Sequence, residues 1–223
     1  MNQTNNNSAR AREDLCRFLA ACYCEPTPDF AEEHLFESML VAAAAIDSEL
    51  IQPARQLGIA FGEQDLQTLL IDHTALFIGP SQPKAMPYAS FWLTDDQSMR
   101  HEATMAVLEF YEQGGFEVTE DLHELPDHIA VELEFLYLLI FAQNQARVSG
   151  SEDEQQAADA LYGRFLSEHL SLWIGEFAGA IKAGTSTRFY RELAELTEYF
   201  VRLEVKWWDA NRLTHHPIAS AVG

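Results

Sequence analysis

The amino-acid sequence predicts an all-α fold, a single globular bundle of about nine to ten helices. Apolar residues recur at intervals of three and four along most of the chain, and residues that suit helix caps stand ahead of these segments. No stretch shows sustained alternation of apolar and polar residues, and no β-branched run is flanked by hairpin turns. These observations argue against a sheet-based fold, and the lack of an internal repeat argues against a solenoid.

The expected helices follow one another with a break or a linker at most boundaries. A Pro-rich break at 25–28 ends the first helix, and the polar stretch 149–154 is the clearest linker. The helices are expected at about 8–24, 29–45, 48–59, 65–77, 95–113, 126–142, 152–169, 172–182 and 186–208. Their candidate caps are Ser8, Asp29, Thr94 or Asp95, and Thr185.

The most apolar of these stretches, from Leu125 to Phe141, is expected to form a core helix with others packed around it. Pro126 suits a first helical turn, and Asp127 behind it suits the exposed N–H groups there. Because the stretch is apolar on almost every side, its ionisable residues are unusual.

Two interpretations of these ionisable residues stay open. Asp127 and Glu134 are seven residues apart, and His128 and Glu132 are four apart, so each pair shares a helix face. In the first interpretation, Asp127 caps the helix, His128 pairs with Glu132, and the glutamates reach the edge of the bundle. In the second, the acids and the histidine form a site for a cationic group.

One long stretch, 78–93, is expected to be non-helical because three prolines fall within eight of its residues. Methionine, tyrosine, phenylalanine and tryptophan crowd behind these prolines, whereas a solvated linker would be polar. The stretch therefore either folds back over the core or lines a groove for a partner, and the two are compatible.

The charge balance is strongly acidic, with 14 Lys and Arg against 35 Asp and Glu and a net charge of −21. Nucleic acid and anionic membrane surfaces are poor partners for such a charge, whereas a basic peptide would be attracted. The first residues lack the apolar core of a secretory signal, and the longest apolar run is shorter than the roughly 20 residues of a membrane span. We expect a cytoplasmic protein without stable membrane insertion.

The sequence contains no recognisable catalytic constellation. A di-iron bundle needs two Glu-x-x-His pairs, but only Glu120–His123 has this spacing, and it lies in an irregular segment. Phosphate-binding glycine loops and nucleophile motifs are missing, and the three cysteines have no second pair of metal ligands. We therefore expect no enzyme activity, no catalytic residues, no metal site and no cofactor.

Two motifs in register resemble the TorD/DmsD/NarJ family of chaperones for bacterial molybdenum oxidoreductases. The first is Leu76-Phe77-Ile78-Gly79-Pro80, followed after a Pro-rich gap by Pro87-Tyr88-Ala89-Ser90-Phe91-Trp92-Leu93. The second is Pro126-Asp127-His128 at the head of the apolar helix, some fifty residues after the first. Their order, their spacing and the all-α chain length agree with the family over most of the sequence.

The resemblance implies a system-specific chaperone. Such a protein binds the twin-arginine leader and the apo catalytic subunit of a molybdopterin oxidoreductase of the DMSO/TMAO reductase type. It aids cofactor insertion and prevents premature export. Carried over onto this sequence, the peptide-binding residues would be Leu76, Phe77, Pro87, Tyr88, Trp92, Asp127 and His128. Glu132 or Glu134 would assist Asp127 in accepting hydrogen bonds from the leader's guanidinium groups.

Two alternatives remain open, a chaperone of the same fold for a non-exported metalloenzyme and a helical metal-binding enzyme with His128, Glu132 and Glu134 as ligands. We expect one domain over 1–223, with a hinged division into 1–125 and 126–223 as the variant. The linker at Ser149-Gly150 could allow the C-terminal helices to exchange between protomers, so the protein is expected to be a monomer or a domain-swapped dimer.

Overall fold

The computed structural model describes residues 2–79, 82–94, 101–117 and 124–215. These residues form eleven α-helices, two of them single turns, and two short π-helical segments. Within the same residues the β-structure consists of one isolated antiparallel bridge, between Tyr88 and His128. The all-α prediction is therefore confirmed. None of the described helices is long and apolar enough to cross a membrane.

The helices are named in chain order. They are α1 (Asn2–Tyr23), α2 (Asp29–Glu32), α3 (Leu35–Ile46), α4 (Ser48–Gly62), α5 (Leu66–His73), α6 (Ala89–Trp92), α7 (His101–Gln113), α8 (Ile129–Ser149), α9 (Glu152–Phe165), α10 (Ser171–Gly184) and α11 (Arg188–His215). The π-helical segments are η1 (Thr74–Ile78) and η2 (Leu166–Leu170).

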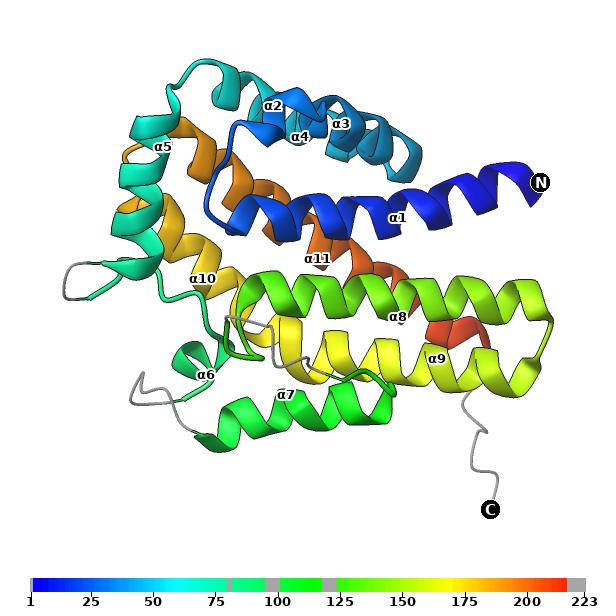
Figure 1. The fold of residues 1–223 in the computed structure, drawn as a ribbon. Coiled ribbons are helices and arrows are strands. Elements are labelled where there is room, and N and C mark those ends of the chain that lie inside the picture. The colour runs from blue at the N-terminus through cyan, green and yellow to red at the C-terminus, as the bar shows by residue number, and fades with distance from the viewer. Residues whose placement is uncertain (1, 80–81, 95–100, 118–123, 216–223) are drawn as a thin grey trace.

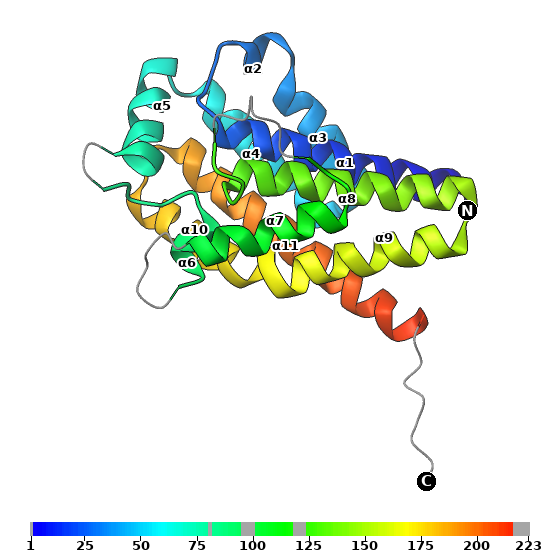
Figure 2. The same cartoon turned by 60° about the horizontal axis from the view of Figure 1, so that its bottom comes forward.

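Helix α8 lies in the middle of the bundle, with α1 packed along one side and α9 along the other (Figure 1, Figure 2). α1 and α8 run antiparallel, and α3 covers a further side of α1. α11 passes behind them and packs against α4 and α10. α8 is therefore enclosed on most sides, as its apolar sequence predicts.

Several helix boundaries differ from the sequence prediction, and both α8 and α11 continue beyond their expected ends, to Ser149 and His215. The helix expected at 29–45 is broken at His34, whose backbone is left-handed with φ of 53°. The break expected near 169–172 is absent, because η2 leads from α9 directly into α10. The central helix begins at Ile129, so Pro126 and Asp127 precede it instead of forming its first turn.

The predicted caps were partly wrong. Ser8 lies inside α1, which begins at Asn2, and Asp29 is the first residue of α2 rather than its cap. Thr185 does act at the start of α11, since its hydroxyl oxygen accepts the N–H of Thr187 at 3.1 Å. Asp95 lies outside the described residues, and the hydroxyl of Thr94 donates to the carbonyl of Ser90.

The main cap of α11 comes from Asp72, a buried residue of α5. Its carboxylate accepts the backbone N–H groups of Ser186 and Thr187, each at 3.0 Å, and the hydroxyls of Thr185, Ser186 and Thr187. Burial alone would raise the pKa of Asp72, but these hydrogen bonds lower it below its ordinary value. Asp72 thereby fixes the beginning of α11 against α5.

A buried ion pair joins the first helix to the last. The guanidinium of Arg12 in α1 binds the carboxylate of Glu204 in α11, with Nε at 2.8 Å from Oε1. The hydroxyl of Tyr162 in α9 accepts from Arg12 at 2.9 Å and donates to Glu204 at 2.6 Å. Glu204 and Tyr162 are buried, so this charge pair depends on all three partners.

We expect Arg12→Ala to lower the free energy of unfolding by about 3–5 kcal/mol, because it leaves the carboxylate of Glu204 buried without its cation. Urea denaturation followed by circular dichroism measures this loss. The matched control is Arg10→Ala, the removal of an exposed arginine from the same helix, which should change stability by less than about 0.5 kcal/mol. Similar losses in both variants would contradict the structural role of the ion pair.

Candidate functional site

The loop between η1 and α6 turns back toward the bundle at Gly79. The φ of this residue is +65°, and a Cβ added there would lie 2.7 Å from backbone atoms of Gln82 and Pro83, so only glycine fits. After the turn, the N–H of Ala85 donates to the carbonyl of Leu76 at 2.8 Å. Ala85, Pro87, Ala89 and Ser90 are buried, so the loop does fold back over the core. Whether it also lines a groove for a partner stays a prediction.

The end of this loop is bound to the head of α8 by three hydrogen bonds. The N–H of Ala89 donates to the carbonyl of Asp127 at 2.9 Å, and the N–H of Ile129 donates to the carbonyl of Pro87 at 2.8 Å. The Asp127 side chain accepts the N–H of Ser90 at 3.0 Å and so caps the single turn of α6. The two sequence motifs, far apart in the chain, are thus joined into one structural unit.

Asp127 is fully buried, and only one of its carboxylate oxygens has a partner. Its Oδ1 atom accepts no hydrogen bond from the described residues, and the nearby hydroxyl of Ser90 is likewise unpaired among them. A buried carboxylate that is half satisfied is costly to keep in place. The interpretation of Asp127 as the cap of the central helix was wrong, because its carboxylate caps α6 instead of α8.

His128 caps α8, since its Nδ1 accepts the N–H of Ala130 at 3.2 Å. Burial lowers the pKa of His128, although the charges of Glu124 and Asp127 act in the opposite direction. The imidazole is therefore neutral at pH 7. The ring of Tyr88 meets it edge-on with ring centres 5.3 Å apart, and the Tyr88 hydroxyl donates to Glu124 at 2.9 Å.

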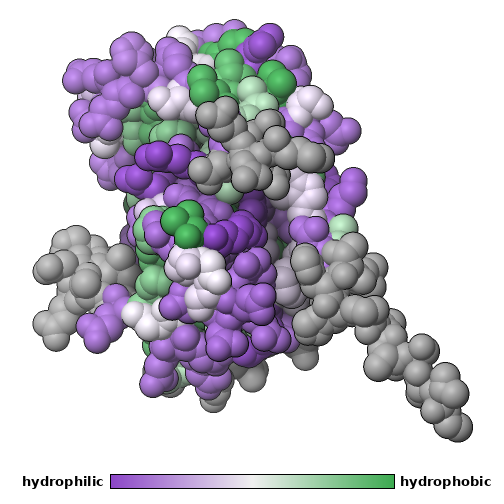
Figure 3. Space-filling view, turned by 90° about the vertical axis from the view of Figure 1, so that its right-hand side faces the viewer, coloured by the Kyte–Doolittle hydropathy of each residue, from purple (hydrophilic) through white to green (hydrophobic). Residues whose placement is uncertain are grey.

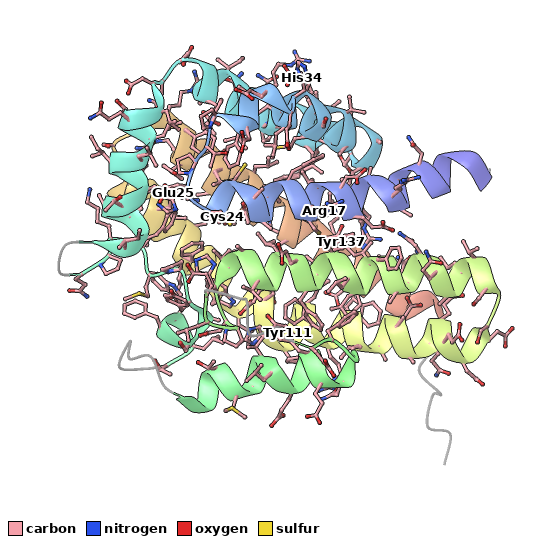
Figure 4. All side chains as sticks on the ribbon, in the orientation of Figure 1. Arg17, Cys24, Glu25, His34, Tyr111 and Tyr137 are labelled. Atoms are coloured by element: carbon pink, nitrogen blue, oxygen red, sulfur yellow. The ribbon has the colours of Figure 1, made fainter. Side chains whose placement is uncertain are left out.

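Three exposed carboxylates lie near this unit, and we call them the acidic mouth: Glu124 and Glu134 act on the charge of Cys24, and Glu25 follows Cys24 in the chain. Burial raises the pKa of Cys24, and the negative charges of Glu134 and Glu124 raise it further. Figure 4 shows Cys24 and Glu25 together at the end of α1, beside the start of α8. None of the three glutamates forms a salt bridge with another described residue.

The sequence prediction included Glu134 in the site but missed Glu25 and Glu124. Both lie in irregular segments, where no helical spacing relates them to other residues. The available signal was that each stands just ahead of a proline at a helix boundary, in Glu25-Pro26 and Glu124-Leu125-Pro126.

The other predicted site residues divide by exposure. Leu76, Phe77 and Pro87 are buried. Phe77 packs against aromatic residues of the core, and its ring centre lies 6.1 Å from that of Tyr23. Tyr88 and Trp92 are partly exposed. The indole N–H of Trp92 donates to the carbonyl of Met86 at 2.7 Å, which fixes the ring at the surface of the loop.

The predicted pairing of His128 with Glu132 is wrong. Glu132 is buried on another side of α8, where His169 Nε2 lies 2.7 Å from Oε1 and the Trp173 indole N–H donates to Oε2 at 3.1 Å. Burial raises the pKa of Glu132. Burial alone would lower the pKa of His169, but the charge of Glu132 and the hydrogen bond raise it. The folded pair therefore retains one proton to higher pH than the unfolded chain does.

The residues proposed as metal ligands do not converge. His128 is bonded to Ala130, Glu132 to His169 and Trp173, and Glu134 is exposed. Within the described part of the chain, no group of three or more histidine, cysteine, aspartate or glutamate residues is arranged to hold a metal ion.

Comparison with known proteins agrees with the two joined motifs. Residues 43–179 match the model of the family described as "Nitrate reductase delta subunit". The chain is 27% identical over 219 residues to the "Chaperone protein TorD" of Shewanella loihica, covering 92% of this chain and 95% of that protein. It is 29% identical over 175 residues to the protein of the same name from Vibrio cholerae serotype O1, covering 77% of each.

A solved structure is also similar, described as a putative redox enzyme maturation protein from Archaeoglobus fulgidus. The sequences are 24% identical, the match covers 89% of this chain and 93% of that one, and the TM-score is 0.47.

The family match and the relatives over most of the chain define the class of protein, the all-α chaperones, which are not enzymes. Because the family model matches more than half of its length, the chain belongs to the nitrate reductase delta subunit (NarJ/TorD) family. The resemblance noted in the two sequence motifs is thereby confirmed.

The Glu132–His169 pair predicts a pH dependence of stability. The unfolded histidine releases its proton near its ordinary pKa of about 6.5, whereas the folded pair keeps that proton to higher pH. The stabilisation that the raised pKa of His169 contributes is therefore complete below about pH 6.5 and is lost as the pH rises. We expect the free energy of unfolding of the wild type to fall as the pH rises above about 6.5, because the pKa of His169 is raised in the folded state. In Glu132→Gln this slope should be much smaller, because the charge that raises the pKa of His169 is gone.

Urea denaturation at several pH values measures both slopes. The matched control is Glu134→Gln, which removes an exposed carboxylate from the same helix and should keep the wild-type slope. Equal slopes in the wild type and Glu132→Gln would show that the pair holds no extra proton.

Proposed function

We propose that this protein is a cytoplasmic, system-specific chaperone for a molybdopterin oxidoreductase of the DMSO/TMAO reductase type. It binds the twin-arginine leader and the apo catalytic subunit, aids cofactor insertion and prevents premature export. Family membership supports this proposal, as do relatives named "Chaperone protein TorD" that match over most of the chain.

The observation that carries the proposal is the acidic mouth, in which the partly exposed ring of Tyr88 is bonded to Glu124, with the partly exposed ring of Trp92 on the same segment of chain. A guanidinium group presents a planar fork of N–H donors that matches a carboxylate in a bidentate manner, and it also stacks on aromatic rings. Glu124 and Glu134 offer carboxylates without a cationic partner among the described residues, and Tyr88 and Trp92 offer the rings. Together they suit the paired arginines of a leader.

Asp127 and His128 have a positioning role in this proposal. Asp127 is fully buried and His128 nearly so. The hydrogen bonds that Asp127 accepts from Ala89 and Ser90, and the edge-on contact of the His128 ring with Tyr88, hold Tyr88 next to Glu124. The buried residues Leu76, Phe77 and Pro87 support the same unit from inside the bundle, and buried Glu132 instead joins α8 to His169 and Trp173. The surface that meets the peptide is then formed by Tyr88, Trp92, Glu124 and Glu134, with Glu25 at its edge.

The strength of binding follows from the number of charged contacts. Two guanidinium–carboxylate contacts of about 1.5–3 kcal/mol each, with apolar contacts beside them, correspond to a Kd of about 1 μM. The net charge of −21 attracts a basic peptide over a longer range, so that association slows as salt rises.

Calorimetry with a twin-arginine leader peptide of a co-encoded molybdoenzyme tests the proposal. We expect Glu124→Gln and Glu134→Gln each to weaken binding by about tenfold, which corresponds to the loss of one charge-assisted contact. The same change at Glu37, an exposed glutamate on α3, should have little effect and serves as the matched control.

Replacing both peptide arginines by lysines should weaken binding to the wild type and reduce the difference between wild type and Glu124→Gln, because lysine cannot form the bidentate contact. No binding of either the leader or the apo subunit would overturn the proposed function. Binding of the apo subunit without the leader would instead indicate a client that is not exported.

A further inference from the structure

Helix α8 carries apolar side chains on its exposed side as well as in the core. Starting from Glu134 of the acidic mouth, steps of four, three, four and three residues lead to Leu138, Phe141, Gln145 and Val148. Phe141 is 39% exposed and Val148 77% exposed, and Leu138 is partly exposed. We call Leu138, Phe141, Gln145 and Val148 the α8 seam.

The seam is flanked by an aromatic residue that is held in place. The ring of Tyr137 lies 6.2 Å from that of Phe141, and the guanidinium of Arg17 on α1 lies over the Tyr137 ring at 5.5 Å. Figure 4 shows Arg17 and Tyr137 facing each other between the two helices. Tyr137 therefore extends the apolar surface of the seam toward α1.

Single exposed apolar residues are ordinary, but the spacing of these is not. Alternating steps of three and four residues keep side chains in one line along a helix, which is the arrangement by which one helix packs against another laid beside it. The opposite side of α8 is already packed in the core through Leu136, Leu139 and Ile140. The seam is thus a second packing face that no described element covers.

We propose that the α8 seam binds a helical apolar segment of the same client peptide whose arginines meet the acidic mouth. This inference rests on the proposed function and extends its site from a charged contact to a line of contacts. The seam begins at Glu134, so a peptide held there by guanidinium groups continues directly over Leu138 and Phe141.

The dimensions set the class of ligand. From Glu134 to Val148 the helix rises about 21 Å, the length of about fourteen residues of a second helix. The ligand is therefore a peptide with guanidinium groups at one end, followed by about fourteen residues that can form a helix with one apolar face. Because the acidic mouth lies at the N-terminal end of α8, a peptide whose arginines come first runs parallel to α8.

A second surface groove, between α1 and α3, supplies a control. Arg10, Asp14, Phe18, Val41 and Ala45 are among the residues that line it. In Figure 3 apolar groups gather in the upper part of the molecule, at the level of α3 and α4. This groove carries charges of both signs and does not include the acidic mouth, and Val41 is 71% exposed there.

The test compares two peptides, one with an arginine pair and fourteen helix-forming residues with an apolar face, and one with the arginine pair alone. Calorimetry with the full-length protein should show the longer peptide binding to the wild type about tenfold more tightly. The double variant Phe141→Ser, Val148→Ser should bind both peptides with nearly equal affinity. Val41→Ser, the matched control on α3, should retain the wild-type preference.

A gain of affinity makes the test independent of any loss of folding. Gln145 is the polar position in the seam, and Gln145→Leu should tighten binding of the longer peptide several-fold while leaving the shorter one unchanged. A double variant that keeps the wild-type preference, or a loss of that preference in Val41→Ser, would overturn the inference while the proposed function stands. Failure of the wild type to bind either peptide would overturn both.

Discussion

The clamp between Asp127 and the chain around Tyr88 is the contact on which the rest of the candidate site depends. It consists of two backbone hydrogen bonds, from Ala89 to Asp127 and from Ile129 to Pro87, and of the Asp127 carboxylate on the N–H of Ser90. A loop rich in proline has few backbone donors of its own to organise it. Its geometry is therefore set by the head of α8, and this brings Tyr88 and Glu124 together at the surface.

Apart from Asp127, whose buried carboxylate is only half satisfied among the described residues, two groups of acidic residues have different physical roles. Asp72, Glu132 and Glu204 are buried, and each is bonded to several donors, because an unpaired charge in the core is strongly unfavourable. Glu25, Glu124 and Glu134 are exposed and lie close to one end of α8, where water can solvate their charges. The buried group holds helices together, and the exposed group gives the proposed peptide surface its charge.

Several elements of the fold were predictable because their causes are local. Examples are the apolar stretch at the start of α8, the prolines at 26 and 28, and Gly150 at the end of α8. Each acts on neighbouring residues, and the segments beside them form the expected α-helices. His34 was not predictable, since a histidine with positive φ has no sequence signal. The role of Glu132 was also missed, because its partners His169 and Trp173 are distant in sequence.

The sequence by itself determined the all-α class, the central place of α8, the excess of negative charge and the family, because periodicity, composition and short motifs can be read without knowing which helices meet. Only the tertiary structure decided which acids are buried, that Asp127 caps α6 instead of its own helix, and that Glu25, Glu124 and Glu134 gather at one end of α8. The physical reason is that burial and hydrogen bonding depend on contacts between residues far apart in the chain, such as Arg12 with Glu204.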